Sequence, residues 1–235
     1  YEKKNGILNY LRTCNVQTGR TGTYILMVVS MVFDWTYDFF TEEEKEEFFF
    51  YTMSGVAQAR ILLNVDYLSS GYFTSGGSET HYLRDFLAFA LAAYDDHPES
   101  YEFIGGALFH EYYPARNYLL PAHTAFQGTS YTYVRDFSTI WSQVLIYRAT
   151  GKKPMSDEMA YLPYDITYAS RSDDNYFREG DDEPEVLHGK PRTILSNYNA
   201  LLISSLYKDP YLKREFLHRT RDGGMFGYDF SGVTP

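Results

Sequence analysis

Residues 41–63 read TEEEKEEFFFYTMSGVAQARILL, and this stretch decides the class of fold. Thr41 followed three residues later by Glu44 is a capping-box signature, in which each side chain accepts a hydrogen bond from the other residue's backbone N–H. The acidic residues 42–44 stand where the helix dipole favours negative charge. The stretch therefore predicts a helix that begins directly after Thr41.

Helical patterns continue on both sides of this stretch. Residues 23–39 are apolar nearly all round, as in a helix that packs on several sides. Because strand signals are few and the connections between helices are mostly short, consecutive helices should form antiparallel hairpins and the fold should be all-α. Apolar stripes and start signals predict the downstream helices at about 79–94, 98–113, 131–150, 156–169, 191–207 and 209–218.

Three segments read as connections rather than helices. Residues 114–130 form a long loop, and long loops in compact domains are usually functional. Residues 171–190 are predicted to form an exposed acidic loop, although the carboxylates of residues 181–183 could bind a hard cation. The Gly-rich residues 221–235 read as a linker toward a further domain that follows a domain at 1–220.

The amino-acid composition limits the classes of molecule that this protein is expected to bind. Aromatic residues make up 18% of the chain, with 24 Tyr and 17 Phe, which suits either a Tyr-rich core or grooves with stacking platforms for sugars. A net charge of −10 argues against nucleic acid and against binding to a membrane surface, which need a basic footprint. An anionic sugar stays possible, since local positive clusters act within a Debye length of ~10 Å.

Neither a disulfide nor a membrane span is predicted. Cys14 is the single cysteine, so the chain can form neither an internal disulfide nor a multi-cysteine metal site. The longest nearly apolar run, residues 25–33, is far shorter than the ~20 residues that a spanning helix needs. No zinc-binding spacing of histidines is present, and no metal site is expected in this chain.

Tyr131 and Arg135 are the best candidates for acid–base chemistry. They are four residues apart at the start of the predicted helix 131–150, which places them on one helical face. A nearby cation favours phenolate over phenol and lowers a tyrosine pKa from ~10. A structural tyrosine lying over an arginine stem would show the same spacing, so the sequence leaves both interpretations open.

Two further segments carry candidate residues. Glu79 and His81 lie in TSGGSETHYLRD, residues 74–85, at the entry of a predicted helix. The long loop supplies polar side chains that could frame a cleft, as Tyr133 could from the following helix. The candidate substrate-binding residues are Asn117, His123, Gln127, Tyr133 and Arg20.

Four stretches, in order along the chain, resemble the helical domain of the heparinase II/III-like polysaccharide lyases. The span from about Val32 to Leu217 carries them, and the third is the most specific. They are FDWTYDFFTEEEK (33–45), SETHYLRDFLAFALAAYDDHPESY (78–101), ARNYLLPAHTAFQGTSYTYVR (115–135) and NYNALLISSLYKDPYLKREFL (197–217).

The resemblance implies an incomplete (α/α) toroid that is normally followed by an antiparallel β-sandwich domain. It implies β-elimination on a uronic-acid polysaccharide such as heparin or heparan sulfate. Tyr131 then matches the family's catalytic tyrosine, Arg135 the arginine one turn on, and Glu79 the glutamate beside the catalytic histidine. Asn117 and His123 lie in the segment that frames the cleft.

One position departs from the family pattern. The family usually has a histidine three residues before this glutamate, and here that position is Gly76. His81 is the nearest substitute, but it lies two residues beyond Glu79. An elimination that needs both a histidine and a tyrosine would then be lost, whereas one in which Tyr131 performs both steps would remain.

Two alternatives to the lyase stay open at this point. Gly76 favours a non-catalytic or impaired polysaccharide-binding domain. A glycoside hydrolase on a similar toroid would need two carboxylates ~5–10 Å apart, and Glu79 with Asp85 or Asp136 is a candidate pair.

The resemblance also implies partners and a location. The expected partner is an anionic polysaccharide, with no nucleic acid and no membrane span, and a homodimer is possible. No cofactor is expected in this chain, although the family's β-sandwich domain holds a structural zinc. A secreted or periplasmic protein is implied by the resemblance and by the bulky substrate.

Overall fold

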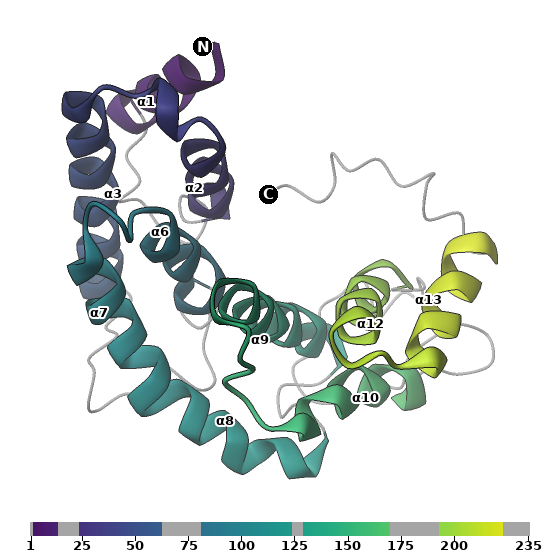
Figure 1. Ribbon diagram of the computed structural model, residues 1–235. Coiled ribbons are helices and arrows are strands. Elements are labelled where there is room, and N and C mark those ends of the chain that lie inside the picture. Colours follow the sequence, from purple (N-terminus) through teal and green to yellow (C-terminus); the bar gives the residue numbers. More distant parts are fainter. Residues whose placement is uncertain (1, 14–23, 63–80, 124–128, 170–192, 223–235) are drawn as a thin grey trace. The chain divides into compact units, whose positions relative to one another are not determined.

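The computed structural model describes residues 2–13, 24–62, 81–123, 129–169 and 193–222 of the chain. Helices account for nearly all of these residues, and no strand occurs among them, so the all-α prediction is confirmed for the described part. The chain forms two compact units, residues 1–114 and 115–234, each described by itself below (Figure 1).

In the first unit, the described residues form α-helices with short 3₁₀ and π segments between them. Helix α2 packs against α1 and α6, and α1 also packs against α3 (Figure 1). The elements are α1 (Glu2–Thr13), α2 (Tyr24–Trp35), η1 (Tyr37–Phe39), α3 (Glu42–Leu62), η2 (His81–Phe86), α6 (Leu87–Ala92), α7 (Pro98–Ala107) and η3 (Leu108–Tyr112).

The capping box predicted before α3 is present. The backbone N–H of Thr41 donates to Glu44 Oε2 at 2.9 Å, and the N–H of Glu44 donates to Thr41 Oγ1 at 3.3 Å. These two bonds satisfy backbone donors that would otherwise have no partner within the helix. The sequence signal therefore marks the true start of α3, at Glu42.

Phenylalanine rings form the centre of this unit's core. Phe33 of α2 and Phe48 of α3 stack with their ring centroids 3.9 Å apart and their planes 3° from parallel. Phe89 of α6 lies 6.1 Å from Phe48, and all three side chains are buried. Some of the chain's many aromatic residues therefore form the core of this unit, although these three rings are Phe rather than the Tyr that the core interpretation predicts.

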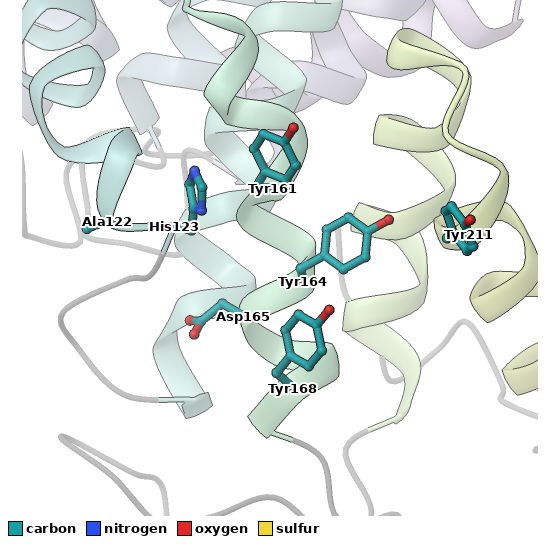
Figure 2. Close-up of a pocket in the computed structure, with 7 residues that line it drawn as sticks. All are labelled: Ala122, His123, Tyr161, Tyr164, Asp165, Tyr168 and Tyr211. Carbon is teal, nitrogen blue, oxygen red and sulfur yellow. The ribbon is translucent and has the colours of Figure 1, made fainter.

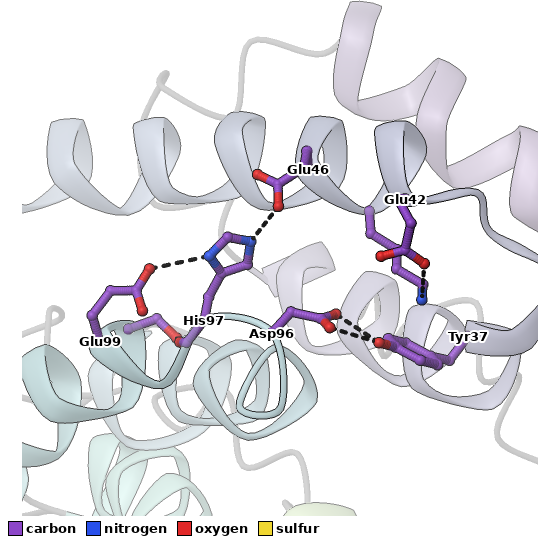
Figure 3. Close-up of polar contacts among 8 residues, drawn as sticks. Tyr37, Glu42, Glu46, Asp96, His97 and Glu99 are labelled. Carbon is purple, nitrogen blue, oxygen red and sulfur yellow. Dashed lines mark hydrogen bonds and ion pairs between the residues drawn. The ribbon is translucent and has the colours of Figure 1, made fainter.

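The turn between α6 and α7 is tied to neighbouring elements by polar contacts (Figure 3). The hydroxyl of Tyr37 donates to the carboxylate of Asp96 at 2.8 Å. The ring of His97 stacks on Phe49 of α3 at 3.5 Å, and its Nδ1 lies 3.1 Å from Glu99 Oε1. Its Nε2 lies 3.3 Å from Glu46 Oε1, so His97 joins this turn to α3.

The second unit is also helical in its described residues. Helix α12 packs against both α13 and α9, and α10 packs against α9 and α12 (Figure 1). Its described elements are α8 (Tyr113–Leu119, of which residues 115–119 belong to this unit), η4 (Leu120–Ala122), α9 (Thr129–Thr150), η5 (Asp157–Tyr161), α10 (Leu162–Ala169), α12 (Thr193–Tyr207) and α13 (Pro210–Asp222).

A buried glutamine joins three parts of this unit. Gln143 of α9 donates from Nε2 to the hydroxyl of Tyr207 in α12 at 2.6 Å. Its Oε1 accepts the backbone N–H of Met155, just before η5, at 2.9 Å. Burial is the largest influence on Tyr207 and raises the pKa of its phenol to about 12, so the phenol stays protonated at neutral pH.

The long loop predicted at 114–130 is wrong over its first part. Residues 113–122 are helical, as α8 and η4. Pro114 lacks an N–H and obstructs an ordinary α-helical turn, which is why the pattern reads as a break. The chain instead passes through the π-helical segment η3 directly before it, and such wider turns shift the hydrogen-bonding pattern. Residues 124–128 lie outside the described part.

The other predicted helices lie near their expected positions, but several are divided. The predicted helices 23–39 and 156–169 each contain a 3₁₀ segment, η1 and η5, and those at 79–94 and 98–113 each contain a π-helical segment, η2 and η3. Helix α1 was not predicted, and α13 extends to Asp222, past the predicted start of the linker at 221. The acidic segment 171–190 and the linker from 223 onward lie outside the described residues. The toroid and the domain at 1–220 therefore stay predictions.

Candidate functional site

Helix α9 carries the tyrosine–arginine pair of the predicted catalytic site. It begins at Thr129, so Tyr131 and Arg135 lie in its first two turns. With 3.6 residues per turn, positions four apart share one face, whereas Tyr133 lies on a different side of the helix. The backbone therefore meets the geometric requirement of the predicted pair.

Of the remaining catalytic candidates, Glu79 and His81, only His81 belongs to the described residues. His81 is the first residue of the π-helix η2, which runs into α6. Glu79, Gly76, Gln127 and Arg20 lie outside the described residues.

Asp85, which the sequence offers with Glu79 as a candidate pair for a glycoside hydrolase, lies in the π-helical segment η2. Its carboxylate is completely buried, and Oδ1 accepts a hydrogen bond from Arg84 Nε at 2.8 Å. A buried charge needs such a partner because leaving water is costly. Asp85 is therefore a structural carboxylate, and it is poorly suited to be one of the two accessible acids of a glycoside hydrolase.

The side chain of Asn117 links α8 to the residue directly before η5. It lies in α8, and its side-chain oxygen accepts the backbone N–H of Ser156 at 2.8 Å. Ser156 is the residue directly before η5, so this bond fixes where η5 begins relative to α8. A substrate-binding role for Asn117 stays a prediction, and the carbonyl oxygen of its amide already has a partner.

His123 closes the segment that follows α8. It adopts the left-handed conformation, with φ 54°, directly after η4. Its Nε2 contacts Glu158 Oε2 of η5, and its ring lies 4.7 Å from the ring of Tyr161. A non-glycine residue at such a φ is uncommon and costs free energy, so it needs support from its surroundings. The contacts with Glu158 and Tyr161 supply this support and hold the ring in place.

A pocket of about 580 Å³ opens beside His123. Figure 2 shows the side chains of Tyr161, Tyr164 and Tyr168 projecting in series from one helical segment, with Tyr211 of α13 facing them. Tyr164 and Tyr168 are stacked with their centroids 6.0 Å apart, and Tyr161 lies 6.4 Å from Tyr164. Ala122, His123 and Asp165 complete the lining.

Asp209 fixes one side of this pocket. Its Oδ2 accepts the hydroxyl of Tyr164 at 2.9 Å, while its Oδ1 accepts the backbone N–H groups of Tyr211 and Leu212 at 2.8 and 3.0 Å. The same carboxylate thus caps α13 and orients Tyr164. Burial, and then the bond to Asp209, raise the pKa of Tyr164 above its usual value, so its phenol remains a donor.

The tyrosine pocket was not predicted from the sequence, although part of its signal is there. The spacing of Tyr161, Tyr164 and Tyr168 is three and then four residues, which puts them on one face of a helix. The contribution of Tyr211 has no such signal, because it comes from a separate helix. The predicted substrate-binding residue His123 does line this pocket.

Neither a metal site nor a membrane span is found in the part of the chain that the structure describes. There, no three His, Cys, Asp or Glu side chains gather as metal ligands would. The described helices are also all too short or too polar to cross a bilayer.

Comparison with known proteins adds no family assignment. No family model matches the sequence, and no curated protein matches it at a significant level.

Proposed function

We propose that this protein cleaves a uronic-acid polysaccharide of the heparin or heparan sulfate kind by β-elimination, with Tyr131 as the acid–base group. The observation that carries the proposal is the position of Tyr131 and Arg135, four residues apart in the first two turns of α9. The resemblance of residues 33–45, 78–101, 115–135 and 197–217 to polysaccharide lyases supplies the reaction.

The reaction requires three tasks from the protein. A base removes the proton at C5 of the uronate, the electron pair forms the C4–C5 double bond, and the C4–O4 bond breaks with protonation of O4. The carboxylate of the uronate must first be neutralised by hydrogen-bond donors, so that charge can develop at C5. In this proposal Arg135 favours the phenolate of Tyr131, and that phenolate takes the proton.

Gly76 limits which substrates could react. Where the C5 proton and the leaving oxygen lie on the same face of the sugar, Tyr131 can take the first proton and return it to O4. Where they lie on opposite faces, a second group is needed, and Gly76 stands where the family has its histidine. The proposed enzyme therefore cleaves one uronate stereochemistry and spares the other.

The test follows ultraviolet absorbance of the unsaturated uronate with heparin, heparan sulfate, chondroitin, dermatan and alginate as separate substrates. We expect Tyr131→Phe to abolish the signal, because the phenol can no longer exchange a proton. The matched control is Tyr147→Phe, at an exposed position of the same helix, which should keep full activity.

The Gly76→His variant distinguishes a lyase site that lacks one residue from a chain that is not a lyase. A signal that appears only in this variant would identify Gly76 as the lesion in an otherwise complete site. If neither form yields an unsaturated product on any of the five polymers, the lyase proposal is wrong for this chain. Binding without turnover would then favour the non-catalytic domain that Gly76 also suggests.

A further inference from the structure

Helix α13 is basic, although the chain as a whole is acidic. Its cationic residues are Lys213, Arg214, Arg219 and Arg221, and its acidic residues are Glu215 and Asp222. The whole chain, by contrast, has a net charge of −10. A local excess of positive charge can attract an anion in spite of the opposite charge elsewhere, because charges at a surface act over a Debye length of ~10 Å.

The packing of α13 decides which of its sides is exposed. The helix packs on α12, and Leu212 is buried. Lys213 and Arg214 are both exposed. Arg221 lies seven residues after Arg214, so these two positions share one face of the helix. The positive charge at the start of α13 therefore faces solvent.

The acidic residues near this surface do not neutralise it. In the described part of the chain, the side chains of Lys213 and Arg214 form no ion pair and no hydrogen bond. Asp209 is occupied by the hydroxyl of Tyr164 and by backbone N–H groups of α13. Glu215 is half-buried and has an interaction of its own. Lys213 and Arg214 are therefore available to a ligand.

Tyr211 connects this basic surface with the tyrosine pocket. It lines the pocket, is 74% exposed and lies three residues before Arg214, on a neighbouring part of the same helix surface. A flat aromatic ring offers its face to the flat apolar face of a sugar ring. Figure 2 also shows that the carboxylate of Asp165 is directed away from the tyrosine rings.

We infer that the start of α13 binds a sulfated polysaccharide, with a sugar ring on Tyr211 and sulfate groups on Arg214 and Lys213. The guanidinium group of Arg presents a fork of N–H donors that matches an oxyanion, and Lys supplies a compact charge. The inference takes only the ligand class, an anionic polysaccharide, from the proposed function. The binding surface that it adds contains none of the residues proposed for elimination.

Isothermal titration calorimetry tests the choice of ligand. The Tyr131→Phe variant is used throughout, so that elimination does not consume the ligand. The ligands are a heparin octasaccharide, the same octasaccharide after removal of its sulfate groups, and polyglutamate of matched charge. Heparin should bind tightest, and its binding should weaken as salt is added. No binding of heparin would overturn the inference, as would equal binding of the desulfated sugar or of polyglutamate.

Charge variants locate the binding surface. Lys213→Gln and Arg214→Gln should each weaken heparin binding about two- to fivefold, as expected when one exposed ion pair is lost. The matched control is Arg148→Gln, which removes an exposed arginine of α9 in the same unit and should bind like the parent protein. Unchanged binding in both α13 variants, or an equal loss in the control, would overturn the location.

Tyr211→Ala tests the contact with the sugar ring. It should weaken heparin binding and leave polyglutamate binding unchanged, whereas Tyr211→Phe keeps the ring and should bind heparin like the parent protein. The control is Tyr118→Ala, which removes an 85% exposed tyrosine of the same unit that does not line the pocket. Equal losses in Tyr211→Ala and Tyr118→Ala would contradict the stacking, while far-ultraviolet circular dichroism verifies that the helices are intact.

The binding assay and the lyase assay can fail separately. Heparin binding that depends on Lys213 and Arg214, without any unsaturated product from the parent protein, would support this inference and reject the lyase. Unsaturated product from the parent protein, together with unchanged binding in the α13 variants, would support the lyase and overturn this inference.

Discussion

At the scale of single residues, polar side chains mark where helices begin and how they are joined. Thr41 and Glu44 exchange hydrogen bonds at the start of α3, and Asp209 caps α13 while holding Tyr164. Each bond satisfies a backbone or hydroxyl group that would otherwise lack a partner. Such residues contribute modestly to stability, but they decide the geometry around them.

Thr41→Ala should lower the free energy of unfolding by about 1 kcal/mol, since it removes the oxygen that accepts the N–H of Glu44. Urea denaturation followed by circular dichroism measures this change. Thr41→Ser keeps the hydroxyl and is the control, with a loss of less than half as much. Equal losses in the two variants would show that the methyl group matters rather than the cap.

Glu47 should give the first unit part of its sensitivity to acid. Its hydrogen bond to Arg12 of α1 is the largest cause that lowers its pKa below the ordinary value of 4.5. A lowered pKa contributes stability that is complete above 4.5 and is lost as the pH falls through the folded-state value. The contribution should be less than about 1 kcal/mol, because both side chains are partly exposed.

Urea denaturation at neutral pH and at a pH below the folded-state pKa of Glu47, well under 4.5, tests this prediction. Glu47→Gln should destabilise the protein at neutral pH and have little effect once the carboxyl of the parent protein is protonated. Glu43→Gln, at an exposed position of the same helix, should show no such pH-dependent difference. A constant effect of Glu47→Gln across the pH range would rule out the ionic contribution.

At the scale of helices, stability comes from aromatic faces that meet. Phe33 and Phe48 stack face to face between α2 and α3, and Phe89 brings α6 to the same cluster. Close packing of this kind leaves few ways to refill the space of a missing ring.

Phe48→Ala should cost about 3–5 kcal/mol, because it removes a fully buried ring and leaves a cavity. Phe50→Ala is the matched control, since Phe50 lies two residues further along α3 and is 65% exposed. We expect the control to change stability by less than about 0.5 kcal/mol. Similar losses for the two variants in urea denaturation would mean that Phe50 is buried in the protein.

At the scale of the whole molecule, the two compact units each have a core of their own. The first is centred on Phe33, Phe48 and Phe89, and the second contains Ile140, Ile203 and other apolar side chains that are buried. Units with separate cores often open as separate cooperative units, which native-state hydrogen exchange can resolve.

We therefore expect Phe48→Ala to speed hydrogen exchange in α3 and α6 while exchange in α12 and α13 is unchanged. Ile203→Ala should have the reverse effect, because Ile203 is fully buried in the second unit. Mass spectrometry of exchanged peptides measures both variants. A uniform acceleration over all helices in either variant would show that the chain unfolds as one unit.

The sequence alone determined the features that depend on near neighbours in the chain. The all-α class, the start of α3 after Thr41, the start of α7 at Pro98 and the position of Tyr131 and Arg135 four residues apart in one helix all follow from short-range rules. The same rules predict that the helix ends at Pro114. The chain instead stays helical there, and it passes through the π-helical segment η3 directly before this proline. The candidate catalytic residues rest on motifs, and they remain predictions.

Only the tertiary structure decided which distant residues meet. Tyr211 joins Tyr161, Tyr164 and Tyr168 because α13 packs on α12 and Asp209 links α13 to Tyr164. Asn117 is occupied by the N–H of Ser156, and Asp85 is buried, although the sequence offered both for a site. Helix periodicity is a local property of the chain, whereas burial and contacts between helices depend on how the whole unit packs, and no local pattern encodes them.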